Sequence, residues 1–360
     1  MHVIALSNQK GGCGKTTSAI NIAASLAHLG KKTLLIDLDP QAHATSGLGI
    51  RSDKVENSIY NVLTEQNEKR KHFLEDVILP VEEMLDLAPS HLLLSTIEQE
   101  LTHKDESVSK LYRALQTLSF PYEFAVIDCP PSLGFLTFNA LRASQTVVVP
   151  IELGSFSLLG VSKLLSMIEL IRVKLQHTPH VYALPTLVDL RTRFAKHMLG
   201  EIANAFGEHI LKNGIRQTVA IRESQAKGRS VLHYDRLSKG AEDYRAAVRE
   251  LLERITADTP ADLNANGARF ELPSNRIRDF VLKAHEAREV HLVGDFNRWS
   301  LSQESLLWRT EEGVWQKRVF LDPGKYRYKF VVDGLWTTDP FNDHLEPNPY
   351  GGLDSVIEIE

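Results

Sequence analysis

Cysteine is scarce in this chain of 360 residues, which contains only Cys13 and Cys129. Two thiols cannot supply the four thiolates that structural zinc sites and most iron–sulfur clusters require within one chain. We therefore expect both residues to be reduced cysteines that serve as small packing side chains.

Long apolar runs and a surplus of positive charge are also missing. No run approaches the roughly 20 apolar residues that a membrane-spanning helix needs, and no signal peptide precedes the first strand-like run. These absences lead us to expect a cytoplasmic protein with no membrane attachment. Because the formal net charge is −5, the chain as a whole has no electrostatic attraction to nucleic acid.

Tryptophan is unevenly distributed, since all four lie within the last 62 residues. The length of the chain allows one large core and a smaller second domain, and this change in composition indicates where the second domain lies. We expect domains at 1–257 and 276–360, joined by a polar linker at 258–275.

The first 255 residues alternate between strand-like and helix-like patterns. Such alternation predicts an α/β domain with a mostly parallel sheet that helices cover on both faces. The expected strands are 2–6, 33–37, 85–88, 124–128, 146–151 and 181–188. The expected helices are 16–29, 91–103, 135–143, 157–175, 193–206 and 239–255.

The most informative segment follows the first strand and reads Gln9-Lys10-Gly11-Gly12-Cys13-Gly14-Lys15-Thr16-Thr17. A glycine-rich turn between a strand and a helix directs backbone N–H groups at a phosphate. Lys15 adds a positive charge for the β- and γ-phosphates, and the Thr16 hydroxyl is a ligand for Mg²⁺. The segment therefore predicts a nucleotide site with magnesium.

Two further segments end in carboxylates. They are Leu34-Leu35-Ile36-Asp37-Leu38-Asp39-Pro40-Gln41 and Phe124-Ala125-Val126-Ile127-Asp128-Cys129-Pro130-Pro131. The carboxyl ends of parallel strands are where such a sheet presents its ligand-binding residues. Phosphoryl transfer needs positioned charge above all, which these carboxylates and the lysines provide.

These three segments, in this order, resemble the ParA/MinD family of P-loop ATPases. The strict P-loop pattern has glycine at position 9, whereas Lys10-Gly11-Gly12 matches the deviant form of that family. The resemblance implies that Lys10 reaches across an ATP-sandwich homodimer to the partner's nucleotide. It also implies an ATP site formed by Lys10, Gly11, Gly12, Cys13, Gly14, Lys15, Thr16 and Thr17. Catalysis would depend on Lys10, Lys15 and Asp39, which orients the attacking water, and the metal site on Thr16, Asp37 and Asp128.

The subgroup follows from what surrounds the ATPase pattern. No helix-turn-helix module precedes residue 2, and the chain continues into a polar linker where MinD has a basic membrane helix. Short chromosomal ParA proteins of the Soj type match this layout. The resemblance implies slow, partner-stimulated ATP hydrolysis, a ParB-like activator, and non-specific binding of nucleoid DNA by the ATP-bound dimer.

A positively charged stretch supports the DNA expectation. Residues 186–245 contain 11 Lys and Arg against 7 Asp and Glu, although the whole chain is negative. Binding through phosphates alone needs no base-reading motif. For each residue taken singly, a solvated surface position is an equally good interpretation. The candidates are Arg191, Arg193, Arg216, Arg222, Lys227 and Arg229.

The C-terminal domain has the pattern of an all-β, immunoglobulin-like sandwich. Its expected strands are 279–283, 289–293, 314–321, 326–332 and 356–360. Gly294-Asp295-Phe296-Asn297-Arg298-Trp299 and the run from Pro323 to Trp336 resemble the glycogen-binding module of the AMP-activated kinase β subunit, a family 48 carbohydrate-binding module. For Trp308 and Trp315, a core position and a surface position fit the sequence equally well.

In that module, two tryptophans and a lysine form an α-glucan platform, which corresponds here to Trp299, Trp336 and Lys329. Indole faces cover the apolar face of glucose, and a cation donates hydrogen bonds to hydroxyl groups. The loop at 348–355 departs from the kinase pattern, with Tyr350 for leucine, Gly352 for threonine and Asp354 for asparagine. We expect Tyr350 to offer a third stacking face.

Three functions fit these patterns. The first is a partition ATPase that positions glycogen or another α-glucan particle on the nucleoid. The second is a chromosome or plasmid segregation ATPase whose β module serves docking or regulation. The third is a carbohydrate-sensing interaction protein that ATP switches without DNA.

Overall fold

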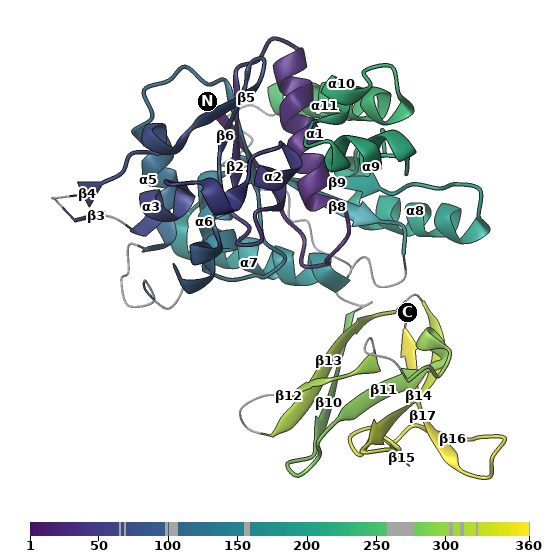
Figure 1. Cartoon of the computed structure of the whole chain (residues 1–360). Helices are drawn as coiled ribbons and strands as arrows, with labels where there is room; N and C mark the ends of the chain where they lie inside the picture. The colour runs from purple at the N-terminus through teal and green to yellow at the C-terminus, as the bar shows by residue number, and fades with distance from the viewer. Residues whose placement is uncertain are drawn as a thin grey trace. The chain divides into compact units, whose positions relative to one another are not determined.

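A computed structural model describes residues 1–64, 66–67, 70–97, 100, 107–154, 159–257, 277–301, 305–309, 313–321 and 323–359. The chain forms two compact units, Met1–Phe270 and Glu271–Glu360 (Figure 1). Each unit is considered by itself. The linker expected at 258–275 lies outside the described residues.

The N-terminal unit is built on a seven-stranded sheet in the order β5-β6-β2-β7-β1-β8-β9. All neighbouring strands are parallel except β5 and β6. The predicted α/β class is therefore confirmed, and the antiparallel edge strand β5 is an addition. The strands are β1 (His2–Leu6), β2 (Thr33–Asp37), β5 (Leu79–Glu82), β6 (Leu85–Ala88), β7 (Phe124–Asp128), β8 (Thr146–Glu152) and β9 (His180–Thr186).

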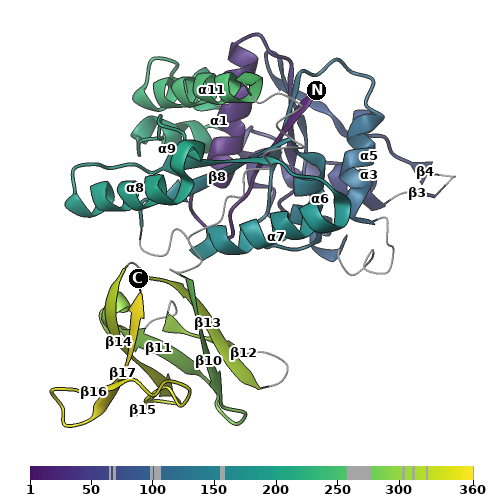
Figure 2. The ribbon, with the colours of Figure 1, turned by 180° about the vertical axis from the view of Figure 1, so that it is seen from behind.

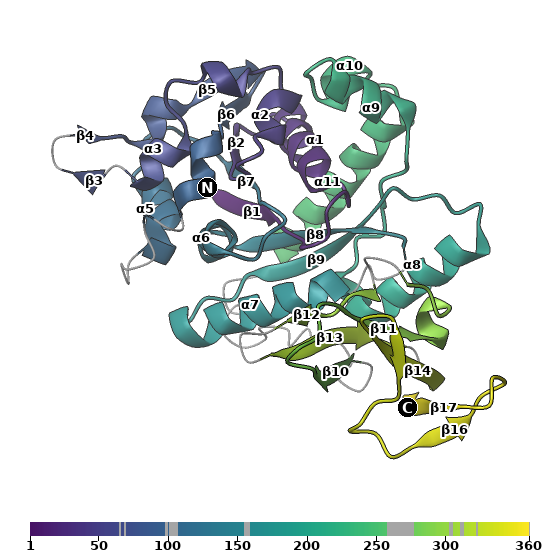
Figure 3. The same ribbon diagram turned by 60° about the horizontal axis from the view of Figure 1, so that its bottom comes forward.

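Helices cover both faces of this sheet, with α1 and α11 on one side and α6 and α7 on the other (Figure 3). The expected helix at 91–103 begins with a 3₁₀ turn, Leu92–Thr96, and is α-helical at Ile97 and Glu100, while the rest of it lies outside the described residues. The α-helices are α1 (Lys15–His28), α2 (His43–Gly47), α3 (Ile59–Thr64), α5 (Lys110–Gln116), α6 (Phe135–Ala143), α7 (Leu159–Leu175), α8 (Arg193–Phe206), α9 (Val219–Ala226), α10 (Val231–Tyr234) and α11 (Lys239–Ala257). A small hairpin is formed by β3 (Gln66–Asn67) and β4 (Arg70–Lys71).

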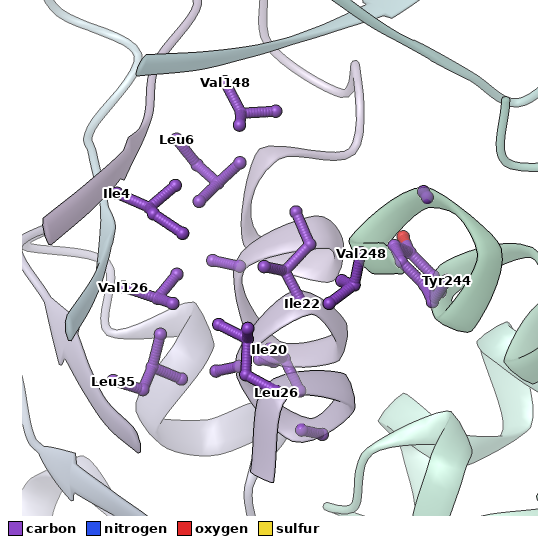
Figure 4. Packing of buried hydrophobic residues seen from close by; sticks show 14 of the residues in the cluster. Ile4, Leu6, Ile20, Ile22, Leu26, Leu35, Val126, Val148, Tyr244 and Val248 are labelled. Atoms are coloured by element: carbon purple, nitrogen blue, oxygen red, sulfur yellow. The ribbon is translucent and has the colours of Figure 1, made fainter. Parts of the chain in front are cut away.

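The core between the sheet and α1 fixes the helix that follows the phosphate-binding loop (Figure 4). Burying each of its large aliphatic side chains contributes about 1.5–3 kcal/mol. Because α1 is held along its whole buried face, its first turn is a rigid support for a ligand. The side chains that meet there are Ile4, Leu6, Ile20, Ile22, Leu26, Leu35, Val126, Val148, Tyr244 and Val248.

The C-terminal unit consists of two antiparallel sheets, β10-β13-β12 and β11-β14-β17-β16, with β15 paired to β14 (Figure 2). Phe280 from the first sheet and Tyr328 from the second meet edge to face at 4.8 Å between ring centroids. Trp315 belongs to this core with 5% exposure, while nothing is described of the Trp308 side chain. The strands are β10 (Ile277–Lys283), β11 (Val290–Gly294), β12 (Trp308–Arg309), β13 (Val314–Phe320), β14 (Gly324–Val332), β15 (Leu335–Thr337), β16 (Leu345–Pro347) and β17 (Leu353–Ile359).

The two sheets share one apolar core, which confirms the predicted sandwich. None of the helices in the described part of the chain combines the length and the apolar composition that a membrane crossing requires.

Two glycines bring the loop after α2 against the loop after α9. Gly49 (φ +79°) and Gly228 (φ +63°) both have left-handed backbone, and a Cβ on Gly228 would lie 2.7 Å from the Cα of Gly49. Gly30 has a similar φ of +78° but no atom within 4 Å of such a Cβ. The approach of the two loops therefore depends on glycine for space as well as for backbone conformation.

We expect Gly228→Ala to lower the free energy of unfolding more than Gly30→Ala. Both substitutions carry the backbone cost of about 1–2 kcal/mol for a left-handed residue, and only Gly228→Ala adds an overpacking cost of about 1–3 kcal/mol. Chemical denaturation of the two variants measures the difference. Equal losses of unfolding free energy in the two variants would contradict this expectation, because they would show that the loops at Gly49 and Gly228 can move apart without cost.

Candidate nucleotide and carbohydrate sites

The phosphate-binding loop runs from the end of β1 to the start of α1. Gly12 and Gly14 have φ values of +74° and +86°, which a side chain would disfavour. The Nζ atom of Lys15 donates to the carbonyl oxygen of Lys10 at 2.8 Å, and the Thr186 hydroxyl donates to the carbonyl oxygen of Cys13 at 2.8 Å. These contacts hold the loop through its carbonyl groups. The positive φ values therefore explain the glycines at positions 12 and 14, and the contact with the Lys10 carbonyl explains the lysine at position 15.

Asp37 and Asp128 lie opposite each other on the paired strands β2 and β7. Both carboxyl oxygens of Asp37 accept hydrogen bonds, from the N–H and hydroxyl of Thr45 at 2.8 and 2.7 Å and from the Asp39 N–H at 3.1 Å. Burial nevertheless raises the pKa of Asp37 to about 6. Asp37 therefore fixes the turn that carries Asp39.

Asp128 differs from Asp37 because its carboxyl oxygens are buried and accept no hydrogen bond from any described residue. Burial and the neighbouring Asp37 raise its pKa well above the ordinary value, and the Thr16 hydroxyl and Lys15 offset only part of this effect. A buried carboxylate without a donor is costly. A cation held by Asp128 and Thr16 would remove that cost, so these residues fit the magnesium site that the sequence predicts.

Lys10 projects away from its own loop. Its Nζ atom pairs with Glu152 at the end of β8, at 2.9 Å, and about 30% of the Lys10 side chain is exposed. Glu152 was not predicted as a site residue. Its position at the carboxyl end of a parallel strand next to β1 is the signal that could have identified it.

The structure brings the predicted nucleotide residues to one edge of the sheet, around the start of α1. Cys13 and Cys129 are both free and buried there, as expected for packing residues. Gln225 on α9 was also not predicted, and its side-chain amide donates to the Thr17 hydroxyl at 2.6 Å. Nothing in the local sequence pattern around Gln225 indicates this contact.

The four predicted carbohydrate residues line one pocket of about 740 Å³ in the C-terminal unit. We call it the aromatic pocket. The rings of Trp299 and Trp336 lie 6.2 Å apart between centroids and 31° from parallel. Trp336 is 50% exposed, and Tyr350 is 95% exposed. The lining residues are Asp295, Trp299, Arg327, Lys329, Trp336, Asn348, Pro349, Tyr350, Gly352 and Asp354.

A strained turn presents Trp299. Arg298 and Trp299 have φ values of +53° and +57°, an uncommon conformation for residues other than glycine. The Trp299 N–H donates to the Gly294 carbonyl at 2.9 Å, and the indole N–H donates to the Asp295 carboxylate at 3.0 Å. Because its polar atom is already bonded, Trp299 offers the pocket its apolar face.

Trp336 lies in the short strand β15. Asp333 and Gly334 (φ +48° and +86°) form a two-residue turn between β14 and β15, the type I′ geometry that Asp-Gly favours. This turn places Trp336 opposite Val331. β15 has only three residues, too few for an alternating pattern to be recognised.

Lys329 and Tyr350 are connected through two polar residues. Asp354 pairs with the Lys329 ammonium at 3.4 Å and accepts a hydrogen bond from the Asn348 side chain at 2.7 Å. The side-chain oxygen of Asn348 accepts hydrogen bonds from the N–H groups of Tyr350 and Gly352 at 3.0 and 2.9 Å. The Tyr350 turn is therefore braced from within the pocket.

The predicted DNA contacts are not equivalent. Arg216 is held by Asp243 through paired hydrogen bonds, so its charge is compensated inside the protein. Arg191 pairs with the exposed Asp189. The remaining candidates are exposed and have no ion-pair partner among the described residues. They are Arg193, Arg222, Lys227 and Arg229.

We expect Asp128→Asn to stabilise the free protein while removing its affinity for magnesium. Ionising a carboxylate whose pKa rises on folding disfavours the folded state, so this destabilisation is absent near pH 4 and grows as the pH rises. At pH 8 in EDTA, the gain in free energy of unfolding should be about 1–3 kcal/mol. It should shrink as the pH falls towards 4.

Thermal and chemical denaturation across this pH range check the expectation. Asp53→Asn is a control, since Asp53 is exposed beside Arg51 and should change stability by less than about 0.5 kcal/mol. An Asp128→Asn variant that is less stable than the wild type at pH 8 would contradict the charge-based account of the site.

Each of the two units matches a known protein family. Residues 1–180 match a family described as an AAA domain. Residues 280–360 match the glycogen recognition site of AMP-activated protein kinase. The aromatic pocket lies within the second match.

Similar proteins cover most of the N-terminal unit. The sporulation initiation inhibitor protein Soj of Bacillus subtilis is 37% identical over 250 residues, 69% of this chain and 97% of the relative. The chromosome partitioning protein ParA of Myxococcus xanthus is 37% identical over 260 residues, 72% and 90% of the two chains.

A solved structure gives the same result for the fold. Cobyrinic acid a,c-diamide synthase from Mycobacterium smegmatis, with bound ADP and magnesium, has a TM-score of 0.61 at 32% identity and covers 72% of this chain and 97% of its own. With the geometry of the loop and the carboxylates, these similarities show that the chain belongs to the ParA/Soj family of chromosome-partitioning P-loop ATPases and carries a C-terminal glycogen-recognition module.

Proposed function

We propose that this protein is a partition ATPase whose ATP-bound homodimer binds nucleoid DNA and whose C-terminal module holds glycogen or another α-glucan particle as cargo. Its role would be to position that cargo in the cytoplasm, with hydrolysis stimulated by a ParB-like activator. The observation that carries the proposal is the presence, in one chain, of a deviant P-loop with a partly exposed lysine and of a braced aromatic pocket.

The nucleotide chemistry assigns a task to each residue of the first site. Residues 10–17 bind the phosphates, Thr16 and Asp128 hold Mg²⁺, and Asp37 supports them by fixing the turn before α2. The metal, when bound, neutralises charge on the phosphates. Lys15 adds a fixed positive charge, and Asp39, 7% exposed, accepts a hydrogen bond from the attacking water and orients it.

Lys10 supports dimerisation because its partner Glu152 lies on a half-exposed surface. An exposed ion pair contributes about 0–1 kcal/mol, so little free energy opposes its exchange for a phosphate of the partner's nucleotide. DNA would be held by the exposed cations Arg191, Arg193, Arg222, Lys227 and Arg229, through phosphates and without base preference. Arg216 is omitted because Asp243 compensates its charge.

The module supports glucan binding through its two indole faces. Trp299 and Trp336 present nearly parallel rings to one pocket, while Lys329 and Asp354 lie beside them as polar partners for hydroxyl groups. Tyr350 at the rim gives a third face. Because hydrogen bonds within the protein hold Trp299 and the Tyr350 turn, little ordering would oppose binding.

The Lys10→Ala variant should bind nucleotide but remain monomeric. Because only the dimer would present enough cations to DNA, the Lys10→Ala variant should also lose ATP-dependent DNA retention. The Lys15→Ala variant should lose nucleotide binding itself. Light scattering and DNA pull-down on unrelated sequences at several salt concentrations measure these effects. Retention by the wild type should fall steeply as salt rises.

Lys31→Ala is a matched control, since Lys31 forms a similar exposed ion pair with Glu123 at the opposite edge of the sheet. It should dimerise normally. ATP-induced dimerisation of Lys10→Ala to the wild-type extent would refute the sandwich dimer. A wild-type protein that dimerises but retains no DNA would leave the carbohydrate-sensing function in its place.

Trp299→Ala with Trp336→Ala should abolish co-sedimentation with glycogen and leave ATP turnover intact. Two modules in one dimer can raise avidity for a multi-chain particle by roughly 10²–10⁴, so the ATP-bound wild type should also sediment far better than Lys10→Ala. Leu335→Ala is the control, because Leu335 is 73% exposed beside Trp336 but does not line the pocket. A wild type that never sediments with glycogen would favour segregation with a docking module.

A further inference from the structure

Helix α1 holds the last three helices of the N-terminal unit through three polar side chains in its first two turns. The views in Figures 1 and 3 show α9, α10 and α11 beside it. The bonds join Thr17 to Gln225 of α9 at 2.6 Å, Ser18 to Tyr244 of α11 at 3.3 Å and Asn21 to Val231 of α10 at 2.8 Å.

The first of these bonds differs from the others because Thr17, in the first turn of α1, belongs to the predicted phosphate-binding segment 10–17. Its hydroxyl oxygen accepts a hydrogen bond from the Gln225 amide. A threonine hydroxyl has one hydrogen to donate as well as lone pairs to accept. That hydrogen is available to an anion bound by the loop.

We propose that Gln225 is an additional positioning residue of the nucleotide site, and that it ties α9 to nucleotide occupancy through Thr17. A hydroxyl that donates to a phosphate becomes a better acceptor, because hydrogen bonds in a chain polarise one another. Bound nucleotide therefore strengthens the bond from Gln225 and orders α9.

The rest of α9 is arranged to transmit this effect. Ile221 and Ser224 are buried on its inner side, and Gly228 just beyond its end lies against Gly49 of the loop after α2. The same α2 turn is held by Asp37. Helix α9 is thus linked to the first turn of α1 through Gln225 and, through Gly228 beyond its end, to the loop after α2.

The outer side of α9 bears exposed cations, with Arg222 on the helix and Lys227 and Arg229 directly after it. The consequence for DNA rests on the proposed function: ordering α9 fixes these charges at constant spacing, so nucleotide and DNA each strengthen the binding of the other. By linkage, the two effects are equal in size.

Hydrogen exchange tests the tie without reference to DNA. Adding the non-hydrolysable analogue AMPPNP with Mg²⁺ to the full-length wild type should slow amide exchange across residues 219–226 by about 2- to 10-fold, the factor equivalent to one hydrogen bond. Gln225→Leu should bind the analogue but show no such slowing. Gln225→Asn, whose amide is one methylene too short, should behave in the same way.

Gln217→Leu is the matched control, since Gln217 is exposed two residues before α9, and it should match the wild type. Slowing in Gln225→Leu equal to that of the wild type would overturn the proposal. So would wild-type exchange that AMPPNP leaves unchanged.

A second measurement separates this inference from the proposed function. DNA should tighten AMPPNP binding to the wild type, by a factor within the usual allosteric range of about 5- to 150-fold, and Gln225→Leu should reduce that factor by about 2- to 10-fold. An unchanged factor would overturn the role of Gln225 in coupling. If the wild type retains no DNA at all, the proposed function fails, and hydrogen exchange alone decides whether Gln225 ties α9 to the nucleotide.

Discussion

Two carboxylates buried side by side at the ends of β2 and β7 determine the organisation of the ATPase unit. Like charges in a low-dielectric interior repel each other and lose their hydration. The fold compensates one of them, because Asp37 accepts two hydrogen bonds from Thr45 of α2 and one from the N–H of Asp39. Asp128 is left without donors among the described residues. Near neutral pH the N-terminal unit therefore retains a local instability that a bound cation would remove, and this ties its stability to its ligand.

The aromatic pocket also contains an energetically unfavourable feature, but one of a different kind. Its strain lies in the backbone, at the consecutive left-handed residues Arg298 and Trp299, and hydrogen bonds that Trp299 donates to the Gly294 carbonyl and the Asp295 carboxylate hold the strained turn. The nucleotide site therefore contains an unfavourable buried charge, whereas the aromatic pocket contains an unfavourable backbone conformation. In the aromatic pocket, hydrogen bonds of the surrounding fold offset the cost, whereas at Asp128 the cost remains for a cation to offset.

The sequence predicts the parts of these sites that are local. The phosphate-binding loop, the strands ending in Asp37 and Asp128 and the main strands of the sandwich can be read from short segments, because glycine placement and apolar runs determine them. Contacts between distant segments cannot be read in this way. Glu152 and Gln225 meet their partners across 142 and 208 positions of the chain. Arg216 looks like any other surface arginine until Asp243 is seen beside it, and β15 is too short to show a period.

The two-residue turn at Asp333 and Gly334 has a consequence for how this module can change over time. Side chains of a strand alternate between its faces, so the length of the turn decides which face Trp336 occupies opposite Val331. Substitutions in the turn alter its stability, but one inserted or deleted residue turns the indole to the other face of the sheet. Lineages of this module should therefore accept point changes around the pocket far more readily than changes in loop length. The spacing between Lys329 and Trp336 is then a better marker of sugar recognition than the identity of the residues between them.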